Sequence, residues 1–419
     1  MIGDGVVITG IGAVTPLGLD RDSTWQGLLA GKSGVGPITA FDAGDLATRI
    51  AAEVRGFVPE EHFTAKRMRR MARFSQFAVV AAREAVADAA LTIDPDLAER
   101  VGVVVNAAVA GFDTVEAATR RLTGPDPAAP GAHFVPASLT NMPACEVAID
   151  LGAHGPVNAS ALACASGTYA LLDAARLIRA GEADVVVCGG TDAAITPVMF
   201  AGLVSMGAMS ERNDDPTGAS RPFGADRDGF VFGEGAVVMV LESAAHARLR
   251  GATWYAAVAG GALTSDAFHV SAPRPGGVHA AAAIRQALRR SGVRPEAVDY
   301  ICAHGTSTRA NDLTETVAIR SALGGAADRV AVSAPKSMLG HLIGAAGALG
   351  AMVCAMAIRE RVVPPTINLY QPDPECDLDY VPHQAREMPV RTALTNAFGF
   401  GGQNCVAVFT DAPSPGDCE

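Results

Sequence analysis

Short apolar strands alternate with helical segments along this chain of 419 residues, and the alternation restarts near residue 252. An apolar strand over 6–8 leads into a glycine-rich turn through Pro16 and Gly18. A similar strand over 255–259 leads into a Gly-Gly turn. Because strands that alternate with helices form layers with substantial parallel sheet, the pattern predicts an α/β fold.

The restart predicts two similar halves, residues 1–251 and 252–412, followed by a loose tail over 413–419. Periodicity and turn residues predict the elements of each half. In the first half they are helix 66–90, strand 101–105, loop 124–131, helix 166–180, strand 185–188 and loop 213–221. In the second half they are helix 277–291, strand 298–303, a helix from about 311, strand 330–333, helix 344–359 and strand 405–409.

Composition narrows the class of protein. Apolar residues make up 49% of the chain and charged residues 18%, which allows a large buried core and disfavours disorder. The net charge of −11 gives no reason to expect bulk attraction to nucleic acid or to an anionic membrane. The longest helical apolar segment, 349–358, is too short to span a bilayer by this estimate.

The N-terminus and the cysteines favour a cytoplasmic protein. Residues 1–4 lack a basic region followed by an apolar stretch, so we expect no secretory signal. The eight cysteines form no Cys-x-x-Cys pair, and most lie in apolar runs, as reduced core cysteines do. A reducing compartment is therefore predicted.

Cys164 is placed where a thiol can react. An apolar strand runs into small residues, and a helix begins directly after the cysteine. The free N–H groups of a helix N-terminus carry partial positive charge, so they can lower the pKa of a thiol and bind an oxyanion. Most free cysteines are inert core residues. The local sequence alone therefore favours a reactive thiol and a structural core cysteine equally.

Two histidines follow predicted strands in the second half. His304 begins a Gly/Thr loop at the end of strand 298–303, and His341 precedes a helix of very small residues. Ligand sites in α/β folds favour such strand ends, although a lone histidine is more often a hydrogen-bonded core residue. The spacing matches no metal site, and no glycine stretch has a dinucleotide or P-loop fingerprint.

Taken together, these segments make the chain resemble the β-ketoacyl synthase family. The matching segments are 163–167 (ACASG), 220–223 (SRPF), 226–236 (DRDGFVFGEGA), 304–308 (HGTST), 336–347 (KSMLGHLIGAAG) and 397–402 (AFGFGG). The resemblance extends over nearly the whole chain and is closest to the stand-alone elongating type of bacterial fatty acid and type II polyketide synthesis. It implies the thiolase fold, five α/β/α/β/α layers built from two duplicated halves.

The family's reaction implies a role for each matched residue. Cys164 would accept an acyl group from acyl carrier protein, and His304 and His341 would promote decarboxylation of malonyl carrier protein. The further roles implied are an oxyanion hole at the N–H groups of Cys164 and Phe400, a gate at Phe400, a buried pair of Lys336 and Glu315, phosphopantetheine contacts at Thr306 and Thr308, and an acyl tunnel lined by Val109. No metal or other cofactor is implied beyond the phosphopantetheine of the carrier.

Two segments depart from the family's pattern. Residues 106–111 read NAAVAG where elongating synthases often have a Gly-Ser-Gly-like loop at the dimer interface, and Gln403 replaces a threonine. The departure at 106–111 leaves open the acyl length and the identity of the dimer partner. The family works as a homodimer or as a heterodimer with a chain-length factor.

A basic run over 66–73 stands out in an acidic chain. The family's equivalent segment docks acyl carrier protein, which makes Lys66, Arg69 and Arg70 candidate docking residues through electrostatic steering. The alternative is a solvated helix face.

Two rival functions remain. A chain-length factor would lack Cys164, so the sequence argues against a non-catalytic partner subunit. A thiolase would use coenzyme A and a second cysteine, which the two histidines and the 398–402 segment disfavour. No spacing typical of a cysteine hydrolase is present.

Overall fold

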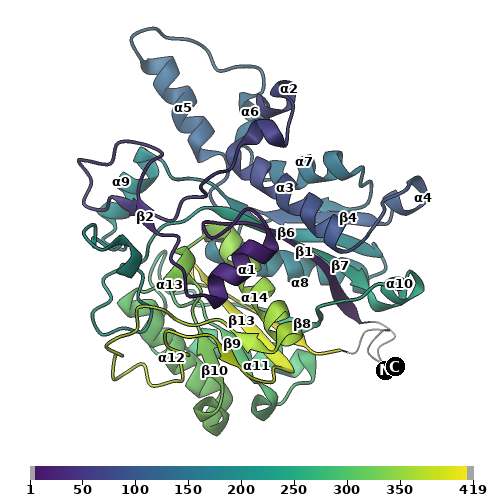
Figure 1. Ribbon diagram of the computed structural model, residues 1–419, viewed down its shortest axis with the longest axis vertical. Coiled ribbons are helices and arrows are strands. Elements are labelled where there is room, and N and C mark those ends of the chain that lie inside the picture. Colours follow the sequence, from purple (N-terminus) through teal and green to yellow (C-terminus); the bar gives the residue numbers. More distant parts are fainter. Residues whose placement is uncertain (1–4, 413–419) are drawn as a thin grey trace.

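The computed structural model describes residues 5–412, so the tail expected at 413–419 and the N-terminal residues 1–4 lie outside the described residues. Strands are interspersed with helices from β1 to α14, and four strands follow α14, ending with β14 (Figure 1). The strands of the large sheet are β1 (Val6–Val14), β4 (Val101–Asn106), β5 (Val157–Asn158), β6 (Val185–Asp192), β7 (Gly235–Ser243), β8 (Ala256–Ser265), β9 (Tyr300–Cys302), β10 (Ala331–Ser333), β13 (Thr392–Gly399) and β14 (Gln403–Thr410).

The longer helices are α1 (Arg21–Leu29), α3 (Arg73–Asp88), α5 (Phe112–Thr123), α7 (Met142–Leu151), α8 (Ser166–Arg179), α9 (Pro197–Ser205), α11 (Val278–Ser291), α12 (Arg309–Leu323) and α14 (Ala346–Glu360). Short helices are α2 (Ala65–Met68), α4 (Pro95–Ala98), α6 (Phe134–Ser138), α10 (Ala244–Leu249) and α13 (Lys336–Leu339). These positions confirm the predicted helices 166–180, 277–291 and 344–359 to within a few residues.

The sheet consists of two halves with the same strand order. Its full order is β10-β9-β13-β14-β8-β1-β7-β6-β4-β5. Read outward from β1, the sequence β7, β6, β4, β5 has the same parallel and antiparallel pairings as β14, β13, β9, β10 read outward from β8. A short antiparallel pairing of Val7 with Ala257 and Ile8 with Ala256 joins the halves. Two similar halves are therefore confirmed, while their boundary at 251/252 stays a prediction.

Helices form three layers around the two half-sheets. α3 packs on the outer face of the first half-sheet, and α11 packs on the outer face of the second, with α12 against α11. α8 and α14 lie together between the half-sheets and contact strands of both. The layer order α/β/α/β/α agrees with the thiolase fold that the resemblance implies.

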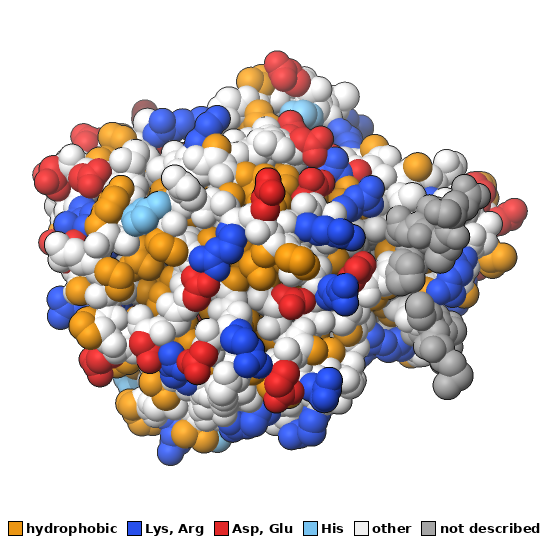
Figure 2. Space-filling model, turned by 60° about the horizontal axis from the view of Figure 1, so that its bottom comes forward, with side chains coloured by type: hydrophobic (Ala, Val, Ile, Leu, Met, Phe, Trp, Pro, Cys, Tyr) orange, Lys and Arg blue, Asp and Glu red, His pale blue; other side chains and the backbone are white. Residues whose placement is uncertain are grey.

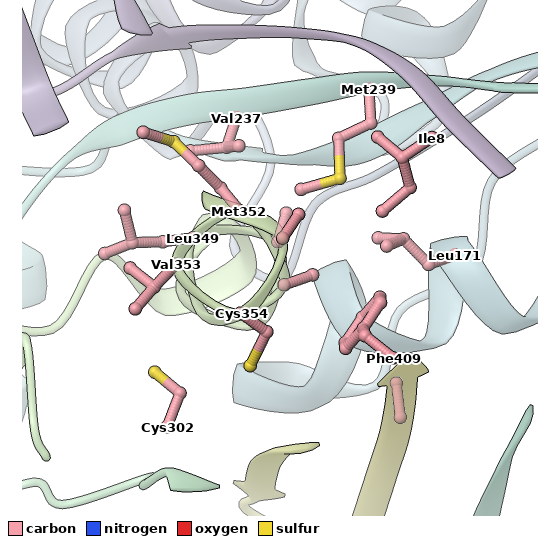
Figure 3. Close-up of a cluster of buried hydrophobic side chains, with 14 of the residues drawn as sticks. Ile8, Leu171, Val237, Met239, Cys302, Leu349, Met352, Val353, Cys354 and Phe409 are labelled. Carbon is pink, nitrogen blue, oxygen red and sulfur yellow. The ribbon is translucent and has the colours of Figure 1, made fainter. Parts of the chain in front are cut away.

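Helix α14 runs through the centre of the molecule. Figure 3 shows it end-on, with Val237 of β7 above it and Cys302 of β9 below it. Every residue from Ala346 to Ile358 is buried. The segment Ile343–Glu360 has 18 residues and a mean hydropathy of 1.4, so the expectation that it is too short to cross a bilayer is wrong, but 89% of it is buried inside the protein. Its apolar character is explained by packing between two half-sheets.

Glycines predicted to form turns lie inside strands instead. Gly10 and Gly12 belong to β1, and Gly260 and Gly261 belong to β8. A Cβ at Gly12 would lie 2.0 Å from a backbone oxygen of α3, and one at Gly260 would lie 2.7 Å from Ser291 of α11. Gly12 is required because α3 packs directly on the strand backbone, and Gly260 leaves room for the Ser291 side chain.

The predicted single helix over 66–90 is also wrong, because the chain leaves the helical conformation between residues 68 and 73. Helix α2 ends at Met68, and α3 begins at Arg73. Met71 is buried, and Ala72 has extended backbone with ψ of 162°, so the chain bends toward the core between the two helices. Strands β7 and β13 were not predicted.

Candidate active site

Cys164 lies in a tight turn at the start of a central helix. The 3-10 turn Ala163–Ala165 leads directly into α8. Ala163 has a φ of +46°, which is strained for a residue with a side chain. The thiol is buried, and burial raises its pKa to about 11, although Lys336 and the N–H groups of Phe400 and Cys164 itself oppose that rise. The positive groups therefore act in the expected direction, but desolvation outweighs them.

The turn after β13 brings Phe400 next to Cys164. A Cβ at Gly399 would lie 2.6 Å from the carbonyl oxygen of Leu162, so the two backbones are in close contact. Gly401 has a φ of +87°, which suits glycine, and its N–H donates to Val270 O at 2.8 Å. The Phe400 side chain is 41% exposed, whereas its backbone N–H faces the Cys164 sulfur.

His341 is held by its backbone and presents one free ring nitrogen. Its N–H donates to Val231 O at 2.7 Å, and its Nδ1 accepts from the Ile343 N–H at 3.1 Å. Since Nδ1 is an acceptor, the proton of the neutral ring is on Nε2. That Nε2 is buried and has no hydrogen-bond partner among residues 5–412. The arrangement leaves one N–H donor available to a substrate.

His304 lies beside His341 and contacts Lys336. The two imidazole centroids are 5.4 Å apart with an interplanar angle of 85°. Lys336 Nζ donates to the His304 carbonyl at 2.6 Å and lies 3.4 Å from His304 Nδ1. Burial first, and the Lys336 charge second, lower the pKa of both histidines well below 6.5. Both rings are therefore neutral near pH 7.

Glu315 holds the backbone of the histidine loop. Its carboxylate accepts the N–H groups of His304 and Gly305 at 2.8 Å each, and the Asn396 amide at 2.9 Å. Glu315 and Lys336 are both buried, and the charge of each influences the pKa of the other, but no direct salt bridge joins them within the described part of the chain. The two groups instead hydrogen-bond to the backbone around His304. Glu315 accepts the N–H groups of His304 and Gly305, and Lys336 donates to the His304 carbonyl.

A cavity of about 730 Å³ connects these side chains. Cys164, His304 and His341 all line it, as do Val109, Thr306, Thr308 and Phe400 from the sequence prediction. The hydroxyl oxygens of Thr306 and Thr308 are 2.9 Å apart. Lys336 and Glu315 lie behind the wall and do not line the cavity.

Part of the cavity wall was missed by sequence reasoning. Met199 and Leu203 of α9 line it, together with Phe230 and Ile343. The only available signal was that α9 is apolar throughout (PVMFAGLVS), which does not distinguish a pocket wall from a core helix. No cluster of His, Cys, Asp or Glu within 5–412 is arranged to hold a metal ion.

Some cations of the basic run at 66–73 form ion pairs within the protein, and others are exposed to solvent. Arg67 pairs with Asp150, and Arg73 donates to Glu234 at 2.9 Å, so these two cations stabilise the fold. Arg70 is half-buried, with Nε 3.6 Å from Glu146. Lys66 and Arg69 are exposed. On the face seen in Figure 2, by comparison, basic and acidic side chains are interspersed.

Comparisons with known proteins show the family of the chain. The family profile for the β-ketoacyl synthase N-terminal domain matches residues 4–247, and the profile for the C-terminal domain matches residues 255–370. The chain is 49% identical over 404 residues to a 3-oxoacyl-(acyl-carrier-protein) synthase 2 of Synechocystis sp., covering 96% of this chain and 97% of the relative. It is 44% identical to a Staphylococcus aureus protein of the same name, with the same coverage.

Solved ketosynthases share the fold over almost their full length. The ishigamide ketosynthase/chain length factor has a TM-score of 0.91 and 38% identity, covering 98% of this chain and 100% of that chain. A type II polyketide ketosynthase in complex with its acyl-carrier protein, bound to the hexaketide, has a TM-score of 0.89 and 33% identity at the same coverage. The chain belongs to the β-ketoacyl synthase family.

Proposed function

We propose that this chain extends an acyl group by two carbons, by decarboxylative condensation with a malonyl group carried on acyl carrier protein. The observation that carries the proposal is the free Nε2–H of His341, a buried, neutral donor facing the same cavity as the Cys164 thiol. A neutral imidazole can stabilise an enolate without a metal.

The first step is acyl transfer to Cys164. The sulfur attacks the thioester carbonyl of the acyl carrier, a new C–S bond forms, and the phosphopantetheine thiol leaves with the proton lost by Cys164. The N–H groups of Cys164 and Phe400 both face the sulfur, where they can bind the developing oxyanion.

The second step forms the new C–C bond. Malonyl carrier protein loses CO₂, and the electron pair of the broken C–C bond becomes an enolate on the thioester. His304 and His341 donate hydrogen bonds to that oxygen. The enolate carbon attacks the acyl carbon, the C–S bond to Cys164 breaks, the Cys164 thiolate takes up a proton from water, and the β-ketoacyl carrier leaves.

The remaining predicted residues have supporting roles. Lys336 and Glu315 position His304 through its backbone. Thr306 and Thr308 line the cavity and offer hydroxyl groups to the phosphopantetheine arm, while Phe400 gates the cavity. The carrier-bound phosphopantetheine is part of the substrate, and the chemistry needs no separate cofactor.

Carrier protein is proposed to dock on the end of α2. Lys66 and Arg69 are exposed and Arg70 is half-buried, so the first two supply most of the free positive charge. An acidic carrier would be steered by these groups.

The chain is proposed to work as a dimer, either with itself or with a chain-length factor. The edge strand β5 and the neighbouring helices α5 to α7 expose apolar side chains in the single chain: Val115 (39%), Leu122 (51%), Val135 (59%), Leu139 (46%), Ile149 (62%) and Val157 (44%). Apolar groups gathered around an unpaired strand edge favour a protein partner. The ketosynthase/chain length factor neighbour supports the heterodimer as the alternative.

A cytoplasmic location is the natural setting for this chemistry, and the cysteines of the described residues are all free thiols. A thiolase-like acyltransferase that uses coenzyme A is the other alternative. It predicts reaction with acyl-coenzyme A and no release of CO₂.

Product mass spectrometry tests the proposal. The chain is incubated with acyl and malonyl carrier proteins, alone and with candidate partner subunits. The expected product is a β-ketoacyl carrier two carbons longer than the acyl donor, with one CO₂ released per product. Activity with acyl-coenzyme A and no CO₂ would contradict the proposal, and activity only with a partner would select the heterodimer.

A further inference from the structure

Asp192 is a fully buried carboxylate near the cavity and forms no salt bridge among residues 5–412. Asp192 is the last residue of β6 and has 0% exposure. A buried carboxylate without a cation is costly unless backbone N–H groups satisfy it. The groups that donate hydrogen bonds to Asp192 must therefore offset the cost of burying it.

The Asp192 carboxylate joins two segments that are far apart in the sequence. Oδ2 accepts the N–H groups of Ala108 at 3.0 Å and Gly344 at 2.7 Å, and Oδ1 accepts that of Val109 at 3.0 Å. Ala108 and Val109 belong to the cavity wall, and Gly344 follows His341 by three residues. Asp192 itself does not line the cavity.

The backbone segments around Asp192 are packed so closely that three glycines there have no space for a side chain. A Cβ at Gly344 would lie 2.5 Å from Asp192 Oδ2, and one at Gly190 would lie 2.3 Å from the Gly344 carbonyl oxygen. A Cβ at Gly167, three residues after Cys164, would lie 2.8 Å from that same oxygen. The Cys164 helix, the His341 segment and the cavity wall therefore meet beside this carboxylate.

Both bound segments contain strained backbone. Ala110 has a φ of +62°, and Ile343, a β-branched residue, has a φ of +52°. Such conformations persist only where the surroundings hold them. The Asp192 hydrogen bonds lie next to both residues, so they are suited to hold this backbone in place.

We propose that Asp192 is a positioning residue that holds the acyl-pocket wall at Ala108 and Val109 in register with the His341 segment. Acyl-chain selection and decarboxylation then depend on one carboxylate. This inference rests on the proposed condensation.

The test compares Asp192→Asn with a matched control, Glu84→Gln. Asn keeps the size of the side chain but places an N–H₂ group where an acceptor oxygen was. Glu84 also binds two backbone N–H groups, of Ala13 at 2.8 Å and Arg21 at 2.7 Å, but it lies outside the cavity lining. Acylation of Cys164 by short and long acyl carriers and CO₂ release from malonyl carrier are measured, each normalised to folded protein.

Asp192→Asn should slow CO₂ release on the order of 10²-fold, the scale for misplacing a reacting group, and should reduce the preference between short and long acyl chains. Acylation by whichever acyl chain the unmodified protein prefers should change by only a few-fold. Glu84→Gln should change thermal stability alone. An Asp192→Asn variant that loses only stability, or that changes one readout and not the other, would overturn the inference.

Asp192→Glu covers the case in which Asp192→Asn does not fold. It keeps the charge and both acceptor oxygens but displaces the bound segments, so both readouts should shift together. If they do not, the inference is wrong. Failure of the condensation itself looks different, since the unmodified chain would then release no CO₂ from malonyl carrier.

Discussion

Burial determines the charge state of the side chains that meet at the cavity. It raises the pKa of the Cys164 thiol to about 11 and lowers the pKa of His304 and His341 well below 6.5. The thiol and both imidazoles are therefore uncharged near pH 7. Lys336 is the cation that faces them, although burial lowers its pKa as well. Neutral donors suit an enolate, which gains negative charge only during the reaction.

The two histidines are expected to affect the two steps unequally. His304→Ala and His341→Ala should each slow condensation on the order of 10²–10³-fold, the scale for losing an oxyanion donor. Acylation of Cys164 should be much less affected, because its oxyanion donors are backbone N–H groups. Single-turnover acylation and CO₂ release separate the steps, with exposed His154→Ala as the control. An equal loss in both steps would show that the division of roles is wrong.

The acid side of the pH profile follows from the lowered histidine pKa. Because both imidazoles stay neutral below pH 6.5 in the folded chain, CO₂ release should persist through pH 6.5 and decline only at lower pH. Initial rates of CO₂ release at each pH, at a temperature well below unfolding, provide the measurement. A midpoint at 6.5 or above would mean that at least one imidazole behaves as though exposed to water.

The family resemblance singled out Cys164, His304 and His341, but it did not predict their contacts. The strand ends and helix starts around them made each a candidate, and all three line one cavity. The Asp192 bond to Gly344 spans 152 residues, and the Glu315 contacts are with backbone N–H groups, so no side-chain pattern reveals either. The Oε1 of Gln403 is buried and has no described partner, and nothing in the structure explains the residue at this position.

At the scale of elements, loops at strand ends bring the site together. The loop after β4 supplies Val109, and the loop after β9 supplies His304. The sequence predicted both strands. It could not predict α9 as a pocket wall, because an apolar helix has the same pattern in a core.

The loop after β4 should set acyl length. Val109→Ala enlarges the cavity on the wall that it lines, so products should shift toward longer chains. The product distribution is measured by mass spectrometry, with Val317→Ala on the exposed surface of α12 as the control. An unchanged distribution would assign length control to another wall or to a partner subunit.

The charges at the end of α2 should affect the rate at which the chain encounters carrier protein and not the rate of the chemical steps. Lys66→Glu with Arg69→Glu should raise KM for carrier-bound substrate and reduce its salt dependence, since steering is screened as the Debye length falls from about 10 Å at 0.1 M to about 3 Å at 1 M. Arg70 is left unchanged because it lies near Glu146.

A small pantetheine thioester needs the cavity but not the surface charges, so its turnover should stay nearly normal. Arg289→Glu with Arg294→Glu, both exposed at or just after the end of α11, makes the same charge change elsewhere. An equal loss toward both substrates would identify α2 as a structural element.

At the scale of the whole molecule, duplication explains where the site lies. The turn before α8 carries Cys164, and the equivalent turn before α14 follows His341. Because α8 and α14 pack together between the half-sheets, Cys164 of the first half and His341 of the second reach the same cavity. The sequence predicted the two halves from the restart of the pattern, whereas the glycines inside β1 and β8 reflect helix contacts that only the packed layers reveal.

The central claim is that Cys164 carries the acyl group until the new C–C bond forms. Intact-protein mass spectrometry in a single turnover tests it most directly. Acyl carrier should add one acyl group, which proteolysis locates on Cys164 and which Cys164→Ala prevents. Malonyl carrier should then remove that group as the β-ketoacyl product appears. Acylation of another residue, or an acyl group that stays on Cys164 while product forms, would contradict the claim.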